Sequence, residues 1–249
     1  MISFFRSLFA PPRHLILILI ALWIALALTE KRAERYHVPK DALSNLVYYS
    51  LFGYILGGRL LYALSNFSAF AQSPLSLFSL NLDLFDPVAA LAAAVIVGIV
   101  YGSRQKLPFW STLDALTPLF TTLMVGLSLS HLAAGTAFGR PTDLPWGMNL
   151  WNATRHPTQI YELLAALVIF GLVRFRRTDL PAGSNFLVFA ALTAGASLFL
   201  EAFRGDSTLI FAGLRLAQVI AWLVLTSTLL AMDLLQKREK TAKKSAPLL

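Results

Sequence analysis

Long blocks of mostly apolar residues recur along this chain, and they constrain its fold more than any other feature. A block of about 20 such residues is long enough to cross the hydrocarbon core of a bilayer as a helix. Inside lipid, backbone hydrogen bonds are satisfied only within helices or closed barrels. We identify seven blocks and predict a helix for each, at residues 15–29, 43–64, 88–102, 113–134, 159–174, 185–202 and 211–235. The sequence therefore predicts an all-α integral membrane protein with about seven transmembrane helices.

Composition supports this class and excludes others. Of the 249 residues, 57% are hydrophobic and only 14% are charged, so we expect one transmembrane bundle over residues 1–236, followed by a basic tail at 237–249. The net charge of +8 does not indicate nucleic-acid binding, because the basic residues flank the apolar blocks, where they set topology and meet anionic headgroups. The absence of cysteine excludes disulfides, thiolate metal sites and cysteine nucleophiles.

The distribution of lysine and arginine predicts an orientation. These residues gather after the first, third and fifth blocks and in the tail, at residues 31–40, 104–106, 174–177 and 237–244. Loops rich in lysine and arginine face the cytoplasm. We therefore expect a cytoplasmic C-terminus and an N-terminus outside. The first 28 residues have features of a signal peptide, but a basic segment follows them, and we interpret them as a retained first helix.

Two segments on the predicted outer face are unusual. Residues 65–87 contain no lysine or arginine and are rich in Phe, Leu and Ser, which suits an arm lying in the membrane interface. Residues 136–158 combine glycines, prolines and tryptophans. That segment is either a lid over a site or a structured connection.

The run at 155–162 concentrates polar chemistry where an apolar block begins. It contains Arg155, His156, Gln159, Tyr161 and Glu162. Ionisable groups at membrane depth are costly and tend to mark a functional site. Three interpretations stay open: a polar corner that orders a loop, a proton acceptor at His156 or Glu162, and lipid binding without turnover.

Other candidates stand at the ends of the blocks. His131 lies in a small-residue stretch and is either a proton acceptor or an interhelical hydrogen-bonded contact. Arg59 follows two glycines in an apolar block, and it either contacts a lipid phosphate or pairs with a buried glutamate. Tyr62, one turn later, serves either packing or the same site.

Four segments together resemble the prolipoprotein diacylglyceryl transferase family: residues 57–62 (GGRLLY), 114–118 (DALTP), 155–162 (RHPTQIYE) and 201–204 (EAFR). Enzymes of this family, in the bacterial inner membrane, move a diacylglyceryl group from phosphatidylglycerol to a lipoprotein cysteine. The resemblance implies a multi-pass protein with an anionic phospholipid and a lipoprotein substrate, and no cofactor. It also implies a set of substrate-binding residues, namely Arg59, Tyr62, Arg140, Arg155, Gln159, Tyr161, Glu201 and Arg204.

The sequence departs from the family pattern where the family carries a histidine, two arginines and a glutamate. Those positions hold Asp86, Ser128, Ser197 and Thr136. Asp86 followed by Pro87 most simply caps the third helix. These departures leave an alternative open: a non-catalytic descendant that binds lipid or joins a partner subunit. A small-solute transporter is less consistent with the sequence, because no paired broken spans occur.

Displacing a phosphate from a lipid glycerol requires cations for the charge on oxygen and a base for the incoming nucleophile. Arginine suits the first task, because its planar fork donates two hydrogen bonds at once. We expect Arg59, Arg140, Arg155 and Arg204 to converge on the phosphate, and His131, His156 or Glu162 to take the proton. No metal site is predicted, because no two of His131, His156, Asp86 and Glu162 share ligand spacing on one helix.

Overall fold

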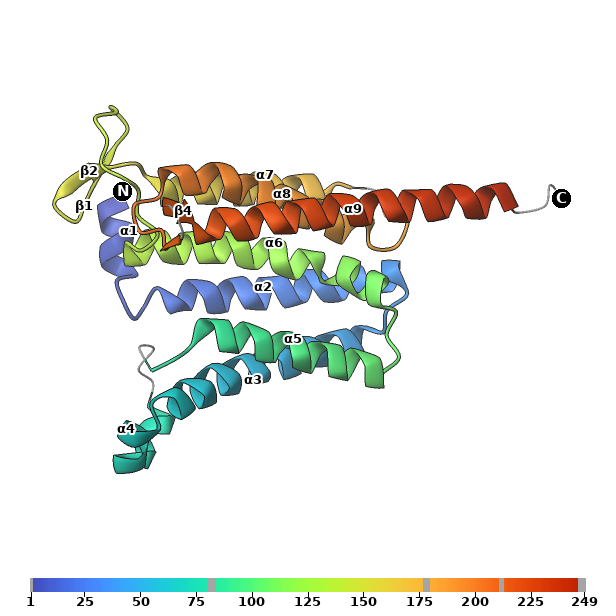
Figure 1. The fold of residues 1–249 in the computed structure, drawn as a ribbon, viewed down its shortest axis with the longest axis horizontal. Helices are drawn as coiled ribbons and strands as arrows, with labels where there is room; N and C mark the ends of the chain where they lie inside the picture. The colour runs from blue at the N-terminus through green and yellow to red at the C-terminus, as the bar shows by residue number, and fades with distance from the viewer. Residues whose placement is uncertain (1, 80–83, 177–179, 211–212, 246–249) are drawn as a thin grey trace. The chain divides into compact units, whose positions relative to one another are not determined.

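The computed structural model describes residues 2–79, 84–176, 180–210 and 213–245, and it is mostly helical (Figure 1). Its α-helices are α1 (Ile2–Leu8), α2 (Leu15–Ala33), α3 (Lys40–Ser65), α4 (Phe67–Gln72), α5 (Pro87–Arg104), α6 (Phe109–Ala134), α7 (Thr158–Arg174), α8 (Ser184–Leu200) and α9 (Leu216–Ser245). Short 3-10 helices are η1 (Glu34–Tyr36), η2 (Pro74–Phe78) and η3 (Glu201–Phe203). The strands are β1 (Met148–Leu150), β2 (Ala153–Arg155), β3 (Leu209–Ile210) and β4 (Leu214–Arg215).

Each of the seven predicted blocks coincides with a helix, and among the described residues four helices are long and apolar enough to cross a membrane. These are α5, α6, α8 together with η3, and α9. The count of seven spans stays a prediction. Two short antiparallel ribbons accompany the helices, because β1 pairs with β2 and β3 with β4. The last helix begins at Leu216, directly after β4, and continues through the basic tail to Ser245; residues 211–212 of the predicted block lie outside the described residues.

The chain forms two compact units, where a single bundle was expected. Unit 1 comprises Met1–Tyr36 and Leu113–Leu249, and unit 2 comprises His37–Thr112. In unit 2, α3 packs closely on α5: a Cβ at Gly57 would lie 2.2 Å from the Cβ of Ala93. Small residues allow such close approach of two helices in a membrane. The expected interfacial arm corresponds to α4 and η2, while residues 80–83 of that segment lie outside the described residues.

Three sequence candidates belong to unit 2. Arg59 donates a hydrogen bond from Nη1 to the carbonyl of Leu84 at 2.6 Å. The ring of Tyr62 packs edge-on against Phe70, with 6.2 Å between the ring centroids. Asp86 accepts hydrogen bonds from the backbone N–H groups of the first turn of α5, with Pro87 as the first helical residue. The prediction that Asp86 caps this helix is confirmed.

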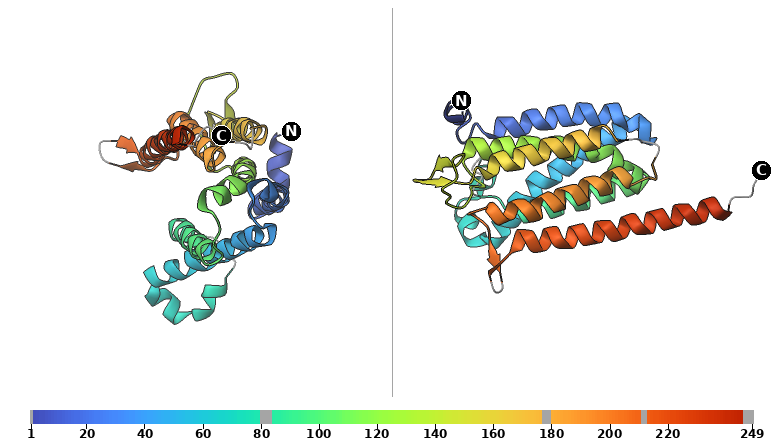
Figure 2. Two further views of the ribbon diagram at one scale, coloured as in Figure 1. Left: turned by 90° about the vertical axis from the view of Figure 1, so that its right-hand side faces the viewer. Right: turned by 90° about the horizontal axis from the view of Figure 1, so that it is seen from above.

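In unit 1, α2 runs antiparallel to α6, and α8 packs against both α7 and α9 (Figure 2). The α2–α6 contact is close, because a Cβ at Gly126 would lie 2.2 Å from the Cβ of Ala21. A buried carboxylate fixes the start of α8. Asp114, which is 1% exposed, accepts hydrogen bonds from the N–H groups of Gly183 and Phe186, each at 2.7 Å. This contact satisfies backbone donors at a helix N-terminus, which have no partner within the helix itself.

Candidate functional site

A cavity of about 590 Å³ opens between α6, α7, α8 and α9 of unit 1. Most of its lining side chains are small or apolar, including Met124, Leu127, Phe189, Ala221 and Val224. Its polar groups gather where α6 ends, α7 begins and α8 passes into η3: these are His131, Glu162, Glu201 and Arg204. The cavity therefore joins an apolar chamber to a charged end, a shape and polarity that suit a lipid.

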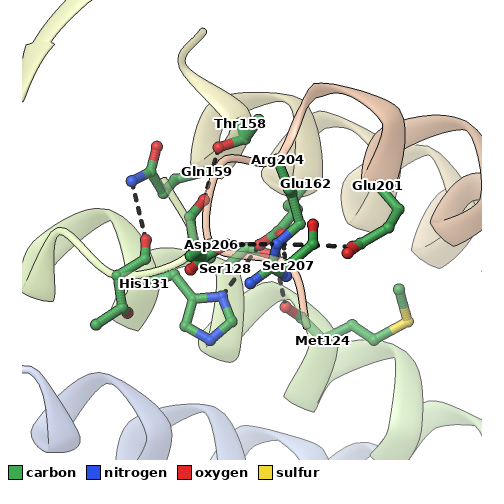
Figure 3. Close-up of polar contacts among 12 residues, drawn as sticks. Met124, Ser128, His131, Thr158, Gln159, Glu162, Glu201, Arg204, Asp206 and Ser207 are labelled. Atoms are coloured by element: carbon green, nitrogen blue, oxygen red, sulfur yellow. Dashed lines mark hydrogen bonds and ion pairs between the residues drawn. The ribbon is translucent and has the colours of Figure 1, made fainter. Parts of the chain in front are cut away.

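Glu162 holds the charged end together (Figure 3). One of its carboxylate oxygens, Oε2, lies 3.0 Å from Nδ1 of His131. The other, Oε1, accepts a hydrogen bond from Nη1 of Arg204 at 3.3 Å. The side chains of His131, Glu162 and Arg204 are between 18% and 27% exposed, so each is partly desolvated yet reachable. This contact fixes the orientation of the His131 ring through one of its two nitrogen atoms.

Arg204 is surrounded by carboxylates. Besides Glu162, its Nε lies 3.0 Å from Oδ1 of Asp206 and 3.6 Å from Oε2 of Glu201. Burial opposes the charged form, but the hydrogen bond to Asp206 and the three negative charges outweigh it and raise the pKa of Arg204 above its ordinary value. Arg204 therefore stays cationic, with most of its charge already compensated.

The turn that carries Arg204 is fixed by a second arginine. Arg215, in β4, is buried and donates from Nη1 to the carbonyls of Glu201 and Arg204 and to the hydroxyl of Ser207. Carbonyl groups at the end of a helix lack intrahelical donors, and a guanidinium supplies them. Arg215 thus positions Arg204 without lining the cavity itself.

Three segments distant in sequence lie side by side at this end of the unit. Residues 138–142 form the middle one, with bridges from Gly139 to Arg204 and from Pro141 to Arg155. Backbone hydrogen bonds join Arg140 to Phe203 and Arg140 to His156. The structure thereby brings Arg140, Arg155 and Arg204 into neighbouring backbone segments.

Their side chains nevertheless do different things. The guanidinium of Arg155 donates to the carbonyls of Leu150 and Gly139 and lies 4.9 Å above the ring of Phe138. The side chain of Arg140 is exposed. Of these three arginines, Arg204 alone lines the cavity. Convergence of the arginines on one point is thus seen for their backbones and not for their guanidinium groups.

The rest of the 155–162 run orders the loop before α7. Gln159 is fully buried and donates to the carbonyl of Thr136 at 2.9 Å. The hydroxyl of Tyr161 accepts a hydrogen bond from the indole of Trp146, and the ring of His156 packs 5.2 Å from that of Phe203. These contacts support the polar-corner interpretation for most of the run, while Glu162 faces the cavity. The 136–158 segment contains the β1–β2 hairpin, so part of it is regular structure.

Gly139 is required by this arrangement. A Cβ there would lie 2.2 Å from the carbonyl oxygen of His156, so the backbone would have to move. We expect Gly139→Ala to destabilise the protein by about 1–3 kcal/mol, as overpacking typically does. Thermal unfolding in detergent measures the change. The matched control is Gly171→Ala in α7, where an added Cβ meets nothing within 4 Å; equal melting temperatures for the two variants would contradict the prediction.

Two basic residues near this end were not singled out in the sequence. Arg6, in α1, places its Nη2 2.9 Å from the position that a Cβ of Gly135 would take. His14 lies just before α2, where burial and the nearby His131 lower the pKa of His14 below its ordinary value. In the sequence, Arg6 and His14 are marked only by their position in the segment that has features of a signal peptide. Within the described ranges, no group of three or more His, Asp or Glu residues is placed to hold a metal ion.

The apolar helices define an integral membrane protein, and its cavity has apolar walls and one charged end. Residues 13–233 match the family described as prolipoprotein diacylglyceryl transferase, and the chain belongs to that family. The chain is 28% identical to the phosphatidylglycerol–prolipoprotein diacylglyceryl transferase of Trichormus variabilis, over 90% of this chain and 86% of that protein. It is 30% identical to the enzyme of the same name from Bordetella parapertussis, over 71% of each chain. The family predicted from the four motifs is confirmed.

Proposed function

We propose that this protein transfers the diacylglyceryl group of phosphatidylglycerol to the thiol of a lipoprotein cysteine. The observation that carries the proposal is the cavity with apolar walls that ends at His131, Glu162 and Arg204. Apolar walls suit the acyl chains, and the charged end suits the bond between glycerol and phosphate. The names of the similar proteins support the same reaction and favour turnover over a non-catalytic descendant.

In the reaction, the sulfur attacks the glycerol carbon that bears the phosphate. A carbon–sulfur bond forms, the carbon–oxygen bond to phosphate breaks, and glycerol phosphate leaves with the electron pair. His131 accepts the thiol proton through the ring nitrogen that does not face Glu162. Glu162 fixes the orientation of the ring and stabilises the imidazolium that forms. Arg204 donates a hydrogen bond to Glu162 and so holds that carboxylate in place at the cavity end.

The remaining candidates take supporting roles in this proposal. Arg155 and Gln159 hold the loop that carries Arg140, and Tyr161 ties that loop to α7. Glu201 pairs with Arg204 at the cavity end. His156 packs among aromatic rings, which makes His131 the better proton acceptor. For Arg59 and Tyr62, in unit 2, the family motif alone supports a role in binding the substrate.

The proposed setting is the bacterial plasma membrane, with seven spans. The basic residues after the first, third and fifth helices and in the tail place the C-terminus in the cytoplasm and the N-terminus outside. The end of unit 1 that carries His131 then faces the outer leaflet, where a lipoprotein cysteine emerges. Phosphatidylglycerol and the lipoprotein are the partners that this function requires, and it requires no cofactor.

The test uses purified full-length protein, phosphatidylglycerol labelled in its acyl chains, and a peptide with one cysteine. We expect label to pass to the cysteine peptide, with an equal amount of glycerol phosphate released, and none to pass to the same peptide with serine. Lipid that stays bound without any transfer would instead support the non-catalytic alternative.

A further inference from the structure

Two basic side chains from the N-terminal segment reach the last turn of α6, and neither lines the cavity. Helices α2 and α6 are antiparallel and meet closely at Ala21 and Gly126. Seven residues before Ala21 stands His14, and five residues after Gly126 stands His131. At a rise of 1.5 Å per residue, His14 and His131 therefore stand within about one helical turn of each other along the axes of the two helices. The electrostatic influence of His131 on His14 agrees with this placement.

Arg6 lies beside Gly135, which is one helical turn beyond His131. The Nη2 and Cζ atoms of Arg6 approach the position that a Cβ of Gly135 would take, and the φ of Gly135, +73°, is in the left-handed region. Any side chain at 135 would meet the guanidinium, so this glycine makes room for Arg6. Arg6, His14 and His131 therefore form a row of basic groups, which we call the α6 basic row.

Two atoms of the α6 basic row are enclosed and unsatisfied. Among the described residues, neither Nε of Arg6 nor Nδ1 of His14 has a hydrogen-bond partner, although both are shielded from solvent. Leaving a buried polar atom unpaired costs free energy, so such an atom indicates a missing partner. The contrast with Arg204 is clear, because three carboxylates surround that arginine. No carboxylate pairs with Arg6 among the described residues.

We propose that Arg6 and His14 bind the phosphate ester of the lipid headgroup, so that the lipid passes His131 with its acyl chains in the cavity and its phosphate on the α6 basic row. This inference rests on the proposed function. An arginine fork donates two hydrogen bonds to a phosphate. Burial lowers the pKa of His14, and His131 lowers it further, so His14 acts mainly as a neutral hydrogen-bond donor. The bond that breaks in the transfer then lies beside His131.

A purely structural role for Arg6 is the competing explanation. The C-terminal end of a helix attracts a cation, and Arg6 lies at that end of α6. However, the carbonyl of Gly135 is already occupied by the indole N–H of Trp151 at 2.9 Å. Within the described part of the chain, no carbonyl accepts a hydrogen bond from Arg6. A capping role predicts loss of stability without loss of lipid affinity, which separates the two explanations.

The experiment compares Arg6→Gln with Arg13→Gln. Both changes remove one positive charge from the same segment, but Arg13 is exposed and donates to the carbonyl of Ser7. Full-length protein is placed in phosphatidylcholine nanodiscs, and binding of fluorescent phosphatidylglycerol is titrated without acceptor peptide. We expect Arg6→Gln to weaken binding about tenfold or more, the size of a charge-assisted contact, and Arg13→Gln to change it by less than about twofold. Arg6→Lys retains the charge and is expected to recover part of the affinity.

Soluble glycerol phosphate, added as a competitor, distinguishes a lipid from a free phosphate ester as the ligand. We expect it to displace the fluorescent lipid only weakly, since it lacks acyl chains. Equal affinities for the Arg6 and Arg13 variants, or a lower melting temperature of Arg6→Gln with unchanged affinity, would overturn the inference. So would displacement by glycerol phosphate at concentrations similar to those of the lipid. Because binding is measured without transfer, a wild-type protein that binds lipid but fails to transfer it would count against the proposed function alone.

Discussion

Replacement of His131 by glutamine is expected to lower kcat for diacylglyceryl transfer by roughly 10²- to 10⁴-fold, the usual contribution of a general base. Glutamine has a size similar to that of histidine, and Glu162 keeps its contact with Arg204, so the cavity keeps its shape while the proton acceptor is lost. Phosphatidylglycerol binding and the melting temperature should therefore remain close to those of the wild type. Initial transfer rates at saturating lipid measure the effect.

The matched control for this variant is His37→Asn. His37 is an exposed histidine directly after η1, at the start of unit 2. Its φ of 56° is one that asparagine tolerates. We expect wild-type transfer from this control. If His131→Gln transfers at the wild-type rate, His131 is not the proton acceptor, and Glu162 and His156 become the candidates.

The largest expected effect on stability comes from Asp114→Ala. This change removes the carboxylate that accepts hydrogen bonds from Gly183 and Phe186, and it leaves buried N–H groups at the start of α8 without partners. We expect a loss of about 3 kcal/mol, since each unsatisfied buried donor costs about 1–3 kcal/mol. For a chain of this length, that loss lowers the melting temperature by roughly 6–12 °C.

Thermal unfolding in detergent, followed by circular dichroism, measures this loss. Asp143→Ala is the control, because Asp143 is an exposed aspartate in the loop before β1. Its melting temperature should change by less than about 2 °C, the scale of most surface substitutions. Similar melting temperatures for the two variants would show that Asp114 does not fix the start of α8.

The helices were predictable because their signal is local. A block of apolar residues long enough to span lipid favours a helix regardless of the rest of the chain, and all seven predicted blocks contain one. Local caps were equally readable, as Asp86 and Pro87 at the start of α5 show. The family was predictable as well, because its motifs are short and contiguous in the sequence.

The candidate site was predictable as a list of residue types and not as an arrangement. Three interpretations were open for the run at 155–162, and its side chains face different surroundings: Gln159 faces the loop, His156 packs against Phe203, and Glu162 is the one residue of the run that lines the cavity. Side chains that neighbour each other on a helix face different surroundings, and those surroundings come from other segments.

By itself, the sequence determined that this chain forms apolar helices, that it belongs to a lipid-modifying family, and which polar residues are too costly to lie in a membrane without a role. Only the tertiary structure decided that Glu162 links His131 to Arg204, that Arg155 holds a loop, and that Arg6 reaches the end of α6. The physical reason is the sequence separation of the interacting residues. Helix formation depends on residues a few positions apart. These contacts depend instead on close packing of distant segments, such as Gly126 against Ala21 and Gly139 against His156, which no local pattern encodes.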